Sequence, residues 1–513
     1  MIYDYIIIGA GISGLYMANY LHQQGKSVCI LEQKMRKGGR IKTVKNGDLI
    51  YEAGAFRFST QHKHLLKLIR QFELDQYIEQ LPATNGKTIK YFLRNGTNTY
   101  HTPVVKNLSS ENILSSLTKK NKTYLENNNL STIISNEYDN ETSKFINDSG
   151  GYDNSFHNAN GLILLKQKKL HNSPFYRLSC GFSKIIDQLA IPSIESKIHY
   201  TKKLLDVSSH GPNGVRITTK DLKMNKIQRY QGKKIIVTIP KENLLEIPFF
   251  RKNIRNLESV SSSSYIRIFA QYPKSKSTGK VWFHKYGYTI TDTSIRKIIP
   301  ENYDRGLCQF YSDWKHADIL RNVVTSGKIK QFVETTLKRI FPNESIPKPT
   351  YFNVHYWQHG NHFWLPTFNS EKISQDMLNP LENIYFVGES YSNNHQAWIE
   401  GALETCEALI AIFELKSKTK SLKKTKPKSL KKISLKEVEK HNTNKSAWTV
   451  YNNKVYDITK FIKLKSHPGG DGAIRVAMGK DISEIFNSIG HSKYAINLLE
   501  KLCIGELKKT TTK

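Results

Sequence analysis

The sequence predicts an α/β fold at the amino terminus, then an α+β region and a small separate α+β module. The first observation is an apolar run at 4–8 that leads into the glycine turn 9–14 and a helical segment. The second is another apolar run, 27–31, which closes on Glu32. The third is a lysine-rich tract at 415–432, which divides the chain into a long and a short part.

The glycine turn has the residues that a dinucleotide site requires. Gly9 permits a tight turn, Gly11 lets the backbone approach a pyrophosphate, and Gly14 lets helix and strand pack closely. The first N–H groups of the helix, including that of Ser13, favour an anion, and Glu32 can accept hydrogen bonds from ribose hydroxyls. The alternative is a glycine-rich turn in another kind of α/β protein.

A second glycine turn, Gly38-Gly39-Arg40, adds a cation near the phosphates and favours FAD over NAD. With it, the opening of the chain resembles the flavin amine oxidase superfamily, which includes monoamine, polyamine and L-amino acid oxidases. This resemblance implies a discontinuous, Rossmann-like FAD-binding domain and an α+β substrate domain.

Composition limits the remaining functions. The formal charge of +33 and the pI near 9.7 predict attraction to polyanions, although the Asn, Lys and Ile bias is also compatible with an AT-rich genome, such as that of a virus. If the chain is viral, a virion location or a decayed structural role is an alternative. The five cysteines are scattered, which indicates a reducing, cytoplasmic compartment rather than disulfides. We expect a soluble protein without a signal peptide or transmembrane segment.

The segment 49–60 reads as a strand and turn, followed by a helix at 63–72. In the superfamily a glycine here, Gly54 in this chain, lies against the flavin. The matching Gly-x-x-Arg of L-amino acid oxidases implies that Arg57 binds the substrate carboxylate, for which a guanidinium is suited. The alternative is a surface arginine in a basic protein.

Two parts of the middle of the chain are less regular. The tract 107–160 is rich in Asn, Ser, Lys and Thr, and we expect short helices and a mobile loop there. The resemblance places the backbone near Val207 against the adenine side of FAD. It also aligns Arg267 with a lysine that holds a water near flavin N5 in many members; a cation in a salt bridge is the alternative.

A third flavin signature follows at 383–403, where a strand ends at Gly388-Glu389 and a helix begins near Ile399. The resemblance implies that Glu389 binds the ribityl chain and that Trp398 stands at the flavin face. His355, His359 and His362 precede this signature in an aromatic segment. A metal site is the less favoured reading of these histidines, because no cysteine or carboxylate stands at ligand spacing.

The segment 433–508 carries a second set of motifs, including His467-Pro-Gly-Gly470 and Gly490-His491-Ser492. Together they resemble cytochrome b5 over its whole length. The resemblance implies haem b with His467 and His491 as axial ligands, 491 − 467 = 24 positions apart as in that family. The module departs from the family in its slightly basic charge, twelve Lys/Arg against eight acids.

These readings predict an oxidase of amines or L-amino acids that passes a hydride to FAD and gives an imine that water hydrolyses. Electrons then go to O2 or to the tethered haem. The alternative within the superfamily is a flavoprotein acting on C–C bonds, of the desaturase or protoporphyrinogen oxidase type. The tract 415–432 should be an extended linker with non-specific polyanion contact as a secondary role. The expected domains are FAD-binding at 1–85, 175–258 and 366–414, substrate-binding at 86–174 and 259–365, and haem-binding at 433–508.

Overall fold

The computed structural model divides the chain into two compact units, which are described separately. The larger unit comprises 1–370 and 381–404, and the smaller comprises 371–380 and 405–513. The residues described are 2–81, 90–92, 115–150, 152–170, 174–209, 214–422, 431–463, 470–489, 491, 493–500 and 502–508.

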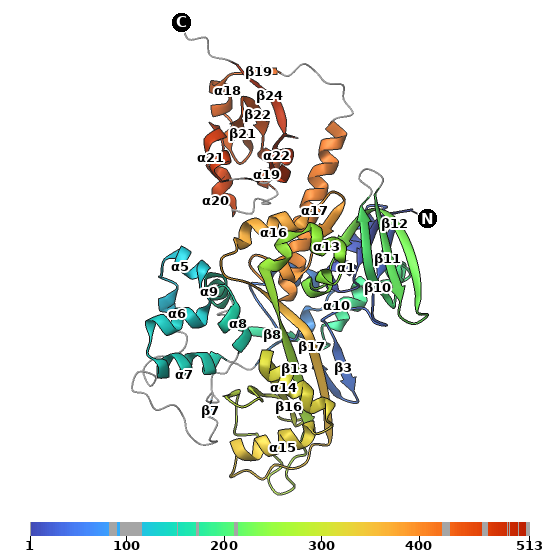
Figure 1. Ribbon diagram of the computed structural model, residues 1–513, viewed down its shortest axis with the longest axis vertical. Helices are drawn as coiled ribbons and strands as arrows, with labels where there is room; N and C mark the ends of the chain where they lie inside the picture. The colour runs from blue at the N-terminus through green and yellow to red at the C-terminus, as the bar shows by residue number, and fades with distance from the viewer. Residues whose placement is uncertain are drawn as a thin grey trace. The chain divides into compact units, whose positions relative to one another are not determined.

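The first sheet of the larger unit has seven strands and carries the glycine turn (Figure 1). At its centre β1 (Ile2–Ile8) runs parallel to β2 (Val28–Leu31) on one side and to β12 (Lys226–Val237) on the other. The outer strands are β9 (Ile198–His199) beside β2, β18 (Ile384–Phe386) beside β12, and the antiparallel pair β11 (Val215–Asp221) and β10 (Lys202–Ser209). Four of these strands, β1, β2, β12 and β18, run parallel to one another. Their carboxyl ends therefore meet at one edge of the sheet, where such sheets bind ligands.

The turn after β1 leads directly into α1 (Ile12–Gln23), and close packing requires glycine at its start. A Cβ on Gly14 would lie 2.0 Å from the carbonyl oxygen of Gly9, so any larger residue would push the helix away from the strand. The expected strand, glycine turn, helix and second strand are thus present in that order.

The second sheet has six strands and is covered on one face by helices. Its order is β17 (Tyr351–Trp364), β13 (Val260–Gln271), β16 (Leu307–Asp313), β15 (Lys297–Asn302), β14 (Thr289–Thr291) and β7 (Lys90–Phe92). Side chains alternate between the two faces. Ile266, Ile268 and Phe310 pack into an apolar core with residues of α14 (Trp314–Thr325) and α15 (Ile329–Ile340). Arg267, Tyr311 and Lys297 take the intervening positions and belong to the other face.

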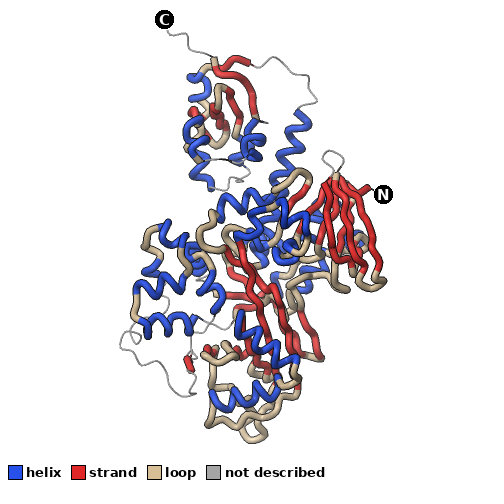
Figure 2. Tube along the Cα trace, viewed as in Figure 1, coloured by secondary structure: helices blue, strands red, loops and turns tan. Residues whose placement is uncertain are grey.

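The polar tract forms short helices, as expected, and they share an apolar core that the sequence did not indicate (Figures 1 and 2). The helices are α5 (Lys122–Asn127), α6 (Leu130–Glu137), α7 (Asn140–Gly150), α8 (Asp153–Asn158) and α9 (Gly161–Leu170). Buried Leu130, Ile133 and Phe156 belong to the shared core. Much of the polar character is helix capping: the side chains of Asn121 and Asn129 accept hydrogen bonds from backbone N–H groups three residues on. Positions 107–114 lie outside the described residues.

Short elements complete the larger unit and connect its sheets. They are β3 (Thr43–Asn46), β4 (Leu49–Glu52), β5 (Phe58–Ser59), α2 (Lys63–Gln71), β6 (Ile78–Gln80), β8 (Phe175–Leu178), α10 (Ser183–Leu189), α11 (Pro192–Glu195), α12 (Lys241–Leu245) and α13 (Pro248–Asn253).

The lysine-rich tract 415–432 is partly helical, which corrects our expectation of an extended linker. α17 (Ile399–Leu422) continues through its first eight positions, and β19 (Lys431–Ile433) contains its last two. Lysine has a high helix propensity, and extending an existing helix does not require a new nucleus. The positions 423–430 between these elements lie outside the described residues.

The smaller unit contains a third sheet, in the order β19, β24 (Cys503–Leu507), β22 (Lys454–Asp457), β21 (Ser446–Tyr451) and β20 (Asn442–Thr443), with β23 (Lys480–Asp481) beside β21. Its helices are α18 (Leu435–Glu439), α19 (Thr459–Lys463), α20 (Gly470–Arg475), α21 (Ser483–Ser488) and α22 (Lys493–Glu500). Tyr451, Ile462 and Ile482 belong to a core that these elements share. Within the described parts of both units, we find no helix with the length and apolarity needed to cross a bilayer.

Candidate active site

A cavity of about 850 Å³ lies in the larger unit and gathers residues from distant parts of the chain. Its walls come from the carboxyl edge of the first sheet, the second sheet, helices α8 and α9, and the segment 388–402. The predicted site residues that line it are Gly9, Gly11, Ser13, Glu32, Gly39, Arg40, Gly54, Arg57, Arg267, Gly388, Glu389, Trp398 and Ile399.

Two predicted residues of the larger unit are not part of the lining. Gly14 packs against the backbone of Gly9, as described above. Val207 is buried within β10, and Lys202, Lys203 and Leu204 of the same strand line the cavity in its place. The lining residues of β10 therefore lie toward the start of the strand, and the contact between this strand and the adenine side of FAD stays a prediction.

The two glycine turns, at 9–14 and 38–39, line the cavity next to each other. A Cβ on Gly11 would meet nothing closer than the Cα of Gly39, at 4.0 Å, so this part of the backbone borders open space. The Glu32 carboxylate accepts hydrogen bonds from the backbone N–H groups of Ala10 and Lys34, both at 2.8 Å, and so ties the end of β2 to the turn. An open backbone cradle before the α1 amino terminus fits the pyrophosphate of FAD.

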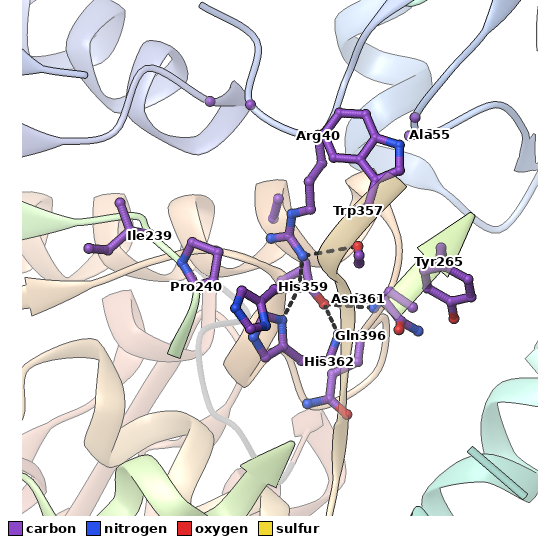
Figure 3. A pocket seen from close by; sticks show the side chains of 18 of the residues that line it. Arg40, Ala55, Ile239, Pro240, Tyr265, Trp357, His359, Asn361, His362 and Gln396 are labelled. Carbon is purple, nitrogen blue, oxygen red and sulfur yellow. Dashed lines mark hydrogen bonds and ion pairs between the residues drawn. The ribbon is translucent and has the colours of Figure 1, made fainter. Parts of the chain in front are cut away.

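Glu389 is the centre of a buried charge network beside this cradle. Its Oε1 accepts hydrogen bonds from Arg40 and from His362 Nδ1, and its Oε2 accepts one from the Ala397 N–H at 2.9 Å. The other ring nitrogen of His362 lies 3.0 Å from a carboxylate oxygen of Glu242 on α12. Figure 3 shows Arg40, His359 and His362 converging on this part of the cavity.

The network sets the charge of its members. Burial alone would raise the pKa of Glu389, but the Arg40 and His362 cations outweigh it and hold that pKa well below its usual range. Burial alone would lower the pKa of His362, but Glu389 and Glu242 together raise it. His362 is therefore a buried imidazolium between two carboxylates.

Of the three histidines of this segment, His359 and His362 share one partner, Glu242, whose Oε2 lies 3.6 and 3.0 Å from their ring nitrogens. His355 Nε2 lies 3.1 Å from the Tyr51 hydroxyl, and His359 Nδ1 lies 3.0 Å from the Ser262 hydroxyl. Among the described residues there is no group of three potential ligands that could hold a metal ion. The carboxylate partners of His362 come from elsewhere in the chain, which is why spacing within the segment did not reveal them.

Arg57 lies on the cavity wall among aromatic rings. Its guanidinium is 4.1 Å from the ring centroid of Phe175 and 5.6 Å from that of Trp398, and Nη2 donates a hydrogen bond to the Tyr152 hydroxyl at 3.1 Å. Within the described ranges no carboxylate lies within ion-pair distance of this half-buried cation. Arg57 is therefore available to an anion that enters the cavity.

Arg267 projects from β13 toward the same region. Its Nη1 donates a hydrogen bond to the backbone oxygen of Glu52 at 3.1 Å, and its guanidinium lies 4.5 Å from the ring centroid of Phe56. No carboxylate of the described chain forms an ion pair with it, so the salt-bridge alternative has no support in this geometry.

Sequence reasoning missed two residues beside Arg57. Tyr152 lines the cavity immediately before α8, and Lys297 is a buried lysine on β15 whose Nζ lies 2.9 Å from the Tyr152 ring centroid. Lys297 is the first residue of β15 and directly follows another cation, Arg296, so its place in the sequence does not distinguish it from a charge at a strand end. Nothing in the polar tract singles out Tyr152.

The smaller unit positions one of the two predicted haem ligands. The His491 ring stacks on Phe486 with centroids 3.9 Å apart, and Nδ1 donates a hydrogen bond to the Phe486 carbonyl oxygen at 2.9 Å. Because the carbonyl can only accept, Nδ1 is the donor of this hydrogen bond and Nε2 is the nitrogen left to ligate a metal, the arrangement typical of a metal-ligating histidine. His467 lies outside the described residues.

Comparison with known proteins agrees with the folds of both units. The family described as flavin containing amine oxidoreductase matches residues 12–408, and the family described as cytochrome b5-like haem/steroid binding domain matches residues 434–508. The chain therefore belongs to the flavin containing amine oxidoreductase family and carries a cytochrome b5-like domain. It is a flavoenzyme that oxidises amines, with FAD and haem b as its cofactors.

Individual relatives show the same division. YobN of Bacillus subtilis (strain 168), provisionally assigned as an L-amino-acid oxidase, is 25% identical over 449 residues, 78% of this chain and 92% of its own. Cytochrome b5 of Drosophila melanogaster is 46% identical over 71 residues, 14% of this chain and 52% of its own, so the module spans about half of that protein. A solved triple mutant of putrescine oxidase shares the fold, with a TM-score of 0.62, 14% identity and coverage of 81% of this chain and 99% of its own.

Proposed function

We propose that this protein oxidises an L-amino acid, or a closely related amine that carries a carboxylate, and that Arg57 binds that carboxylate. The observation that supports the proposal is the Arg57 guanidinium in the cavity wall, near the rings of Phe175 and Trp398, which forms no ion pair with a carboxylate of the described residues. Only one hydrogen bond, from Nη2 to Tyr152, is made by this guanidinium among the described residues, so its other donors are suited to bidentate recognition of a substrate carboxylate. YobN is similar to this chain over most of its length, and its provisional assignment as an L-amino-acid oxidase is consistent with this substrate class.

The other predicted residues have roles that follow from their positions. The N–H groups of the Gly9–Gly14 turn and Arg40 would face the FAD pyrophosphate, Glu32 the ribose, and the Glu389 network the neighbouring part of the cofactor. Bound FAD supplies two-electron oxidation, taking a hydride from the carbon that bears the amine. Trp398 would bound the substrate side, and Arg267 would be a permanent cation there, because arginine has no accessible neutral form.

The substrate carboxylate provides a direct test. An L-amino acid is compared with the amine that differs from it by loss of the carboxylate, and flavin bleaching, ammonia and peroxide are measured for both. In the Arg57→Ala variant the amino acid should bind about 10- to 150-fold more weakly, since a hydrogen bond to a charged group contributes about 1.5–3 kcal/mol. The decarboxylated amine should be unaffected.

The control is Arg70→Ala, which removes an arginine whose side chain is 70% exposed on α2. If Arg57→Ala weakens both compounds equally, or if no amino acid bleaches the flavin of the wild-type protein, the assignment to carboxylate recognition is wrong.

For the electron acceptor we propose transfer to the haem of the same chain, with O2 as the competing acceptor. Rapid mixing with substrate without added reductase separates the two. Haem bands that become reduced as the flavin reoxidises support internal transfer. A flavin that bleaches while the haem stays oxidised contradicts it.

A further inference from the structure

Tyr152 is held in the cavity by an anchored helix start. The buried Asp313 on β16 accepts hydrogen bonds from the first N–H groups of α8, those of Asp153 and Asn154, at 3.3 and 3.2 Å. Arg296 donates two hydrogen bonds to the Asp153 carboxylate, at 2.8 and 2.9 Å. Both anchors come from the second sheet, so Tyr152, the residue before α8, has a fixed place over that sheet.

Two cations approach Tyr152 from different elements. Arg57 donates to its hydroxyl at 3.1 Å, and the Lys297 ammonium lies 2.9 Å from its ring centroid. Lys297 is 1% exposed, and its Nζ has no hydrogen-bond partner among the described residues. A buried ammonium without a hydrogen bond is costly unless a neighbouring anion compensates it.

The remaining groups that face Tyr152 include both signs of charge. Arg267 from β13 adds a third cation, and the rings of Tyr311 and Tyr265 lie beyond it, Tyr311 with its centroid 6.2 Å from that of Tyr152. Asp313 and Asp153 add carboxylates, but Arg296 neutralises Asp153, and burial raises the pKa of Asp313 to about 6. The cations prevail around the Tyr152 hydroxyl.

We propose that Tyr152 is the group that accepts the proton from the substrate ammonium, and that Lys297 is the positioning residue that keeps Tyr152 ionised. The inference rests on the proposed function, which brings a substrate carboxylate to Arg57 and hence an ammonium group near Tyr152. The proton passes from the ammonium nitrogen to the phenolate oxygen, giving a neutral amine and a neutral tyrosine. The freed lone pair then assists departure of the hydride from the adjacent carbon.

The electrostatics agree with this assignment. Burial alone would raise the pKa of Tyr152, but Lys297 and Arg57 outweigh it and lower the pKa to about 7. Burial lowers the pKa of Lys297 to about 8. A general base is most effective when its pKa lies near the working pH. Arg267, at the position of the family's lysine, cannot serve as a base.

The ionisation can be measured without turnover. In full-length protein carrying tyrosine labelled with carbon-13 at Cζ, one resonance should titrate near neutral pH and be absent in Tyr152→Phe. In Lys297→Met the same resonance should titrate about two pH units higher, since a buried cation within a few ångströms is lost. Tyr272→Phe, which alters a buried tyrosine outside the cavity lining, should leave the resonance unchanged.

Flavin reduction by an amino acid then tests the proton transfer. Tyr152→Phe should slow the reaction about 100-fold at pH 7, and its rate should rise tenfold per pH unit as the free amine supplies the reactive form. Lys297→Met should shift the pH profile upward and retain the plateau at high pH.

Two results would overturn the inference: no tyrosine ionising below pH 9, or a Tyr152→Phe protein whose substrate affinity falls while its pH profile stays that of the wild type. The second result would reduce Tyr152 to a residue that orients Arg57. If no amino acid bleaches the wild-type flavin, the proposed function fails first, and the proton-transfer role fails with it, although the resonance still reports the ionisation of Tyr152.

Discussion

Gly11 and Gly14 stand three positions apart in the same turn, yet the structure predicts opposite consequences for replacing them with alanine. A methyl group on Gly11 would meet no atom closer than 4.0 Å, and its φ of −75° is one that alanine adopts without strain. A methyl group on Gly14 would lie 2.0 Å from a backbone oxygen. Gly11→Ala should therefore spare the fold and impair FAD binding, whereas Gly14→Ala should impair the fold itself.

The magnitudes follow from these distances. Alanine at position 11 restricts the unfolded chain, worth about 0.4–1 kcal/mol, and is a slightly poorer helix cap than glycine, so the unfolding free energy of the FAD-free protein should change by less than about 1 kcal/mol. The same methyl group would enter the space that we assign to the pyrophosphate, which should weaken FAD binding by about 1–3 kcal/mol, or roughly 5- to 150-fold in affinity. Gly14→Ala should lower the unfolding free energy by about 2–3 kcal/mol.

Urea unfolding of the FAD-free proteins and FAD titration followed by flavin fluorescence measure the two quantities separately. Gly25→Ala is the control for a nearby glycine whose added Cβ would contact nothing, although its φ of +67° introduces strain outside the turn. Normal FAD affinity in Gly11→Ala would refute the placement of the pyrophosphate, and equal destabilisation by both substitutions would refute the distinction between cradle and packing glycine.

Three further predictions concern charges and ligands. Glu389→Gln should lower the unfolding free energy by about 3–5 kcal/mol in urea, because it leaves the Arg40 and His362 cations without their shared anion. Burial alone would raise the pKa of Glu242, but His362 outweighs it and lowers that pKa to about 2. A lowered carboxyl pKa stabilises the folded protein at pH values above the ordinary 4.5, and this stability is lost as the carboxylate is protonated. The free energy of unfolding should therefore fall as the pH drops from 4.5 to 2, and it should fall less steeply in Glu242→Gln. His491→Ala should abolish the haem absorption bands and keep the flavin spectrum, whereas His441→Ala, which removes a histidine stacked on Trp448 in the same unit, should keep both.

The sequence predicted those parts of the fold that depend on local order. A strand, glycine turn, helix and acidic strand end are encoded within the first 32 residues, and their positions relative to one another follow from one βαβ unit. The core of α5–α9 was missed, because its apolar residues are divided among five short helices and no single helix shows a long apolar period. The helix over 415–422 differs from the predicted extended linker, because lysine favours a helix that is already nucleated even though its charge disfavours a packed core. Polyanion contact through 415–432 stays a prediction.

Site residues that belong to a sequence motif could be predicted, whereas residues brought together only by the pairing of distant strands could not. Arg57 and Glu389 stand in recognisable segments, so the sequence singled them out. Lys297 and Tyr152 are 145 positions apart in the chain and belong to no motif, and they meet because α8 is anchored on the second sheet. Such contacts depend on pairing between distant strands, for which a single sequence gives no register.

That register also gives a reason for the arginine at position 267. Arg267 pairs with His355 on one side and with Tyr311 on the other, and Tyr311 pairs with Lys297, so these four side chains form a row across four strands on one face. In the row the permanent cation stands at position 267, which the resemblance aligns with the family's lysine, and the titratable Lys297 stands two strands away, beside the ring of Tyr152. If proton acceptance has moved along the row with it, Arg267→Lys alone should leave the pH profile of flavin reduction dependent on Tyr152. A profile in Arg267→Lys that no longer responds to Tyr152→Phe would show instead that position 267 controls the proton transfer.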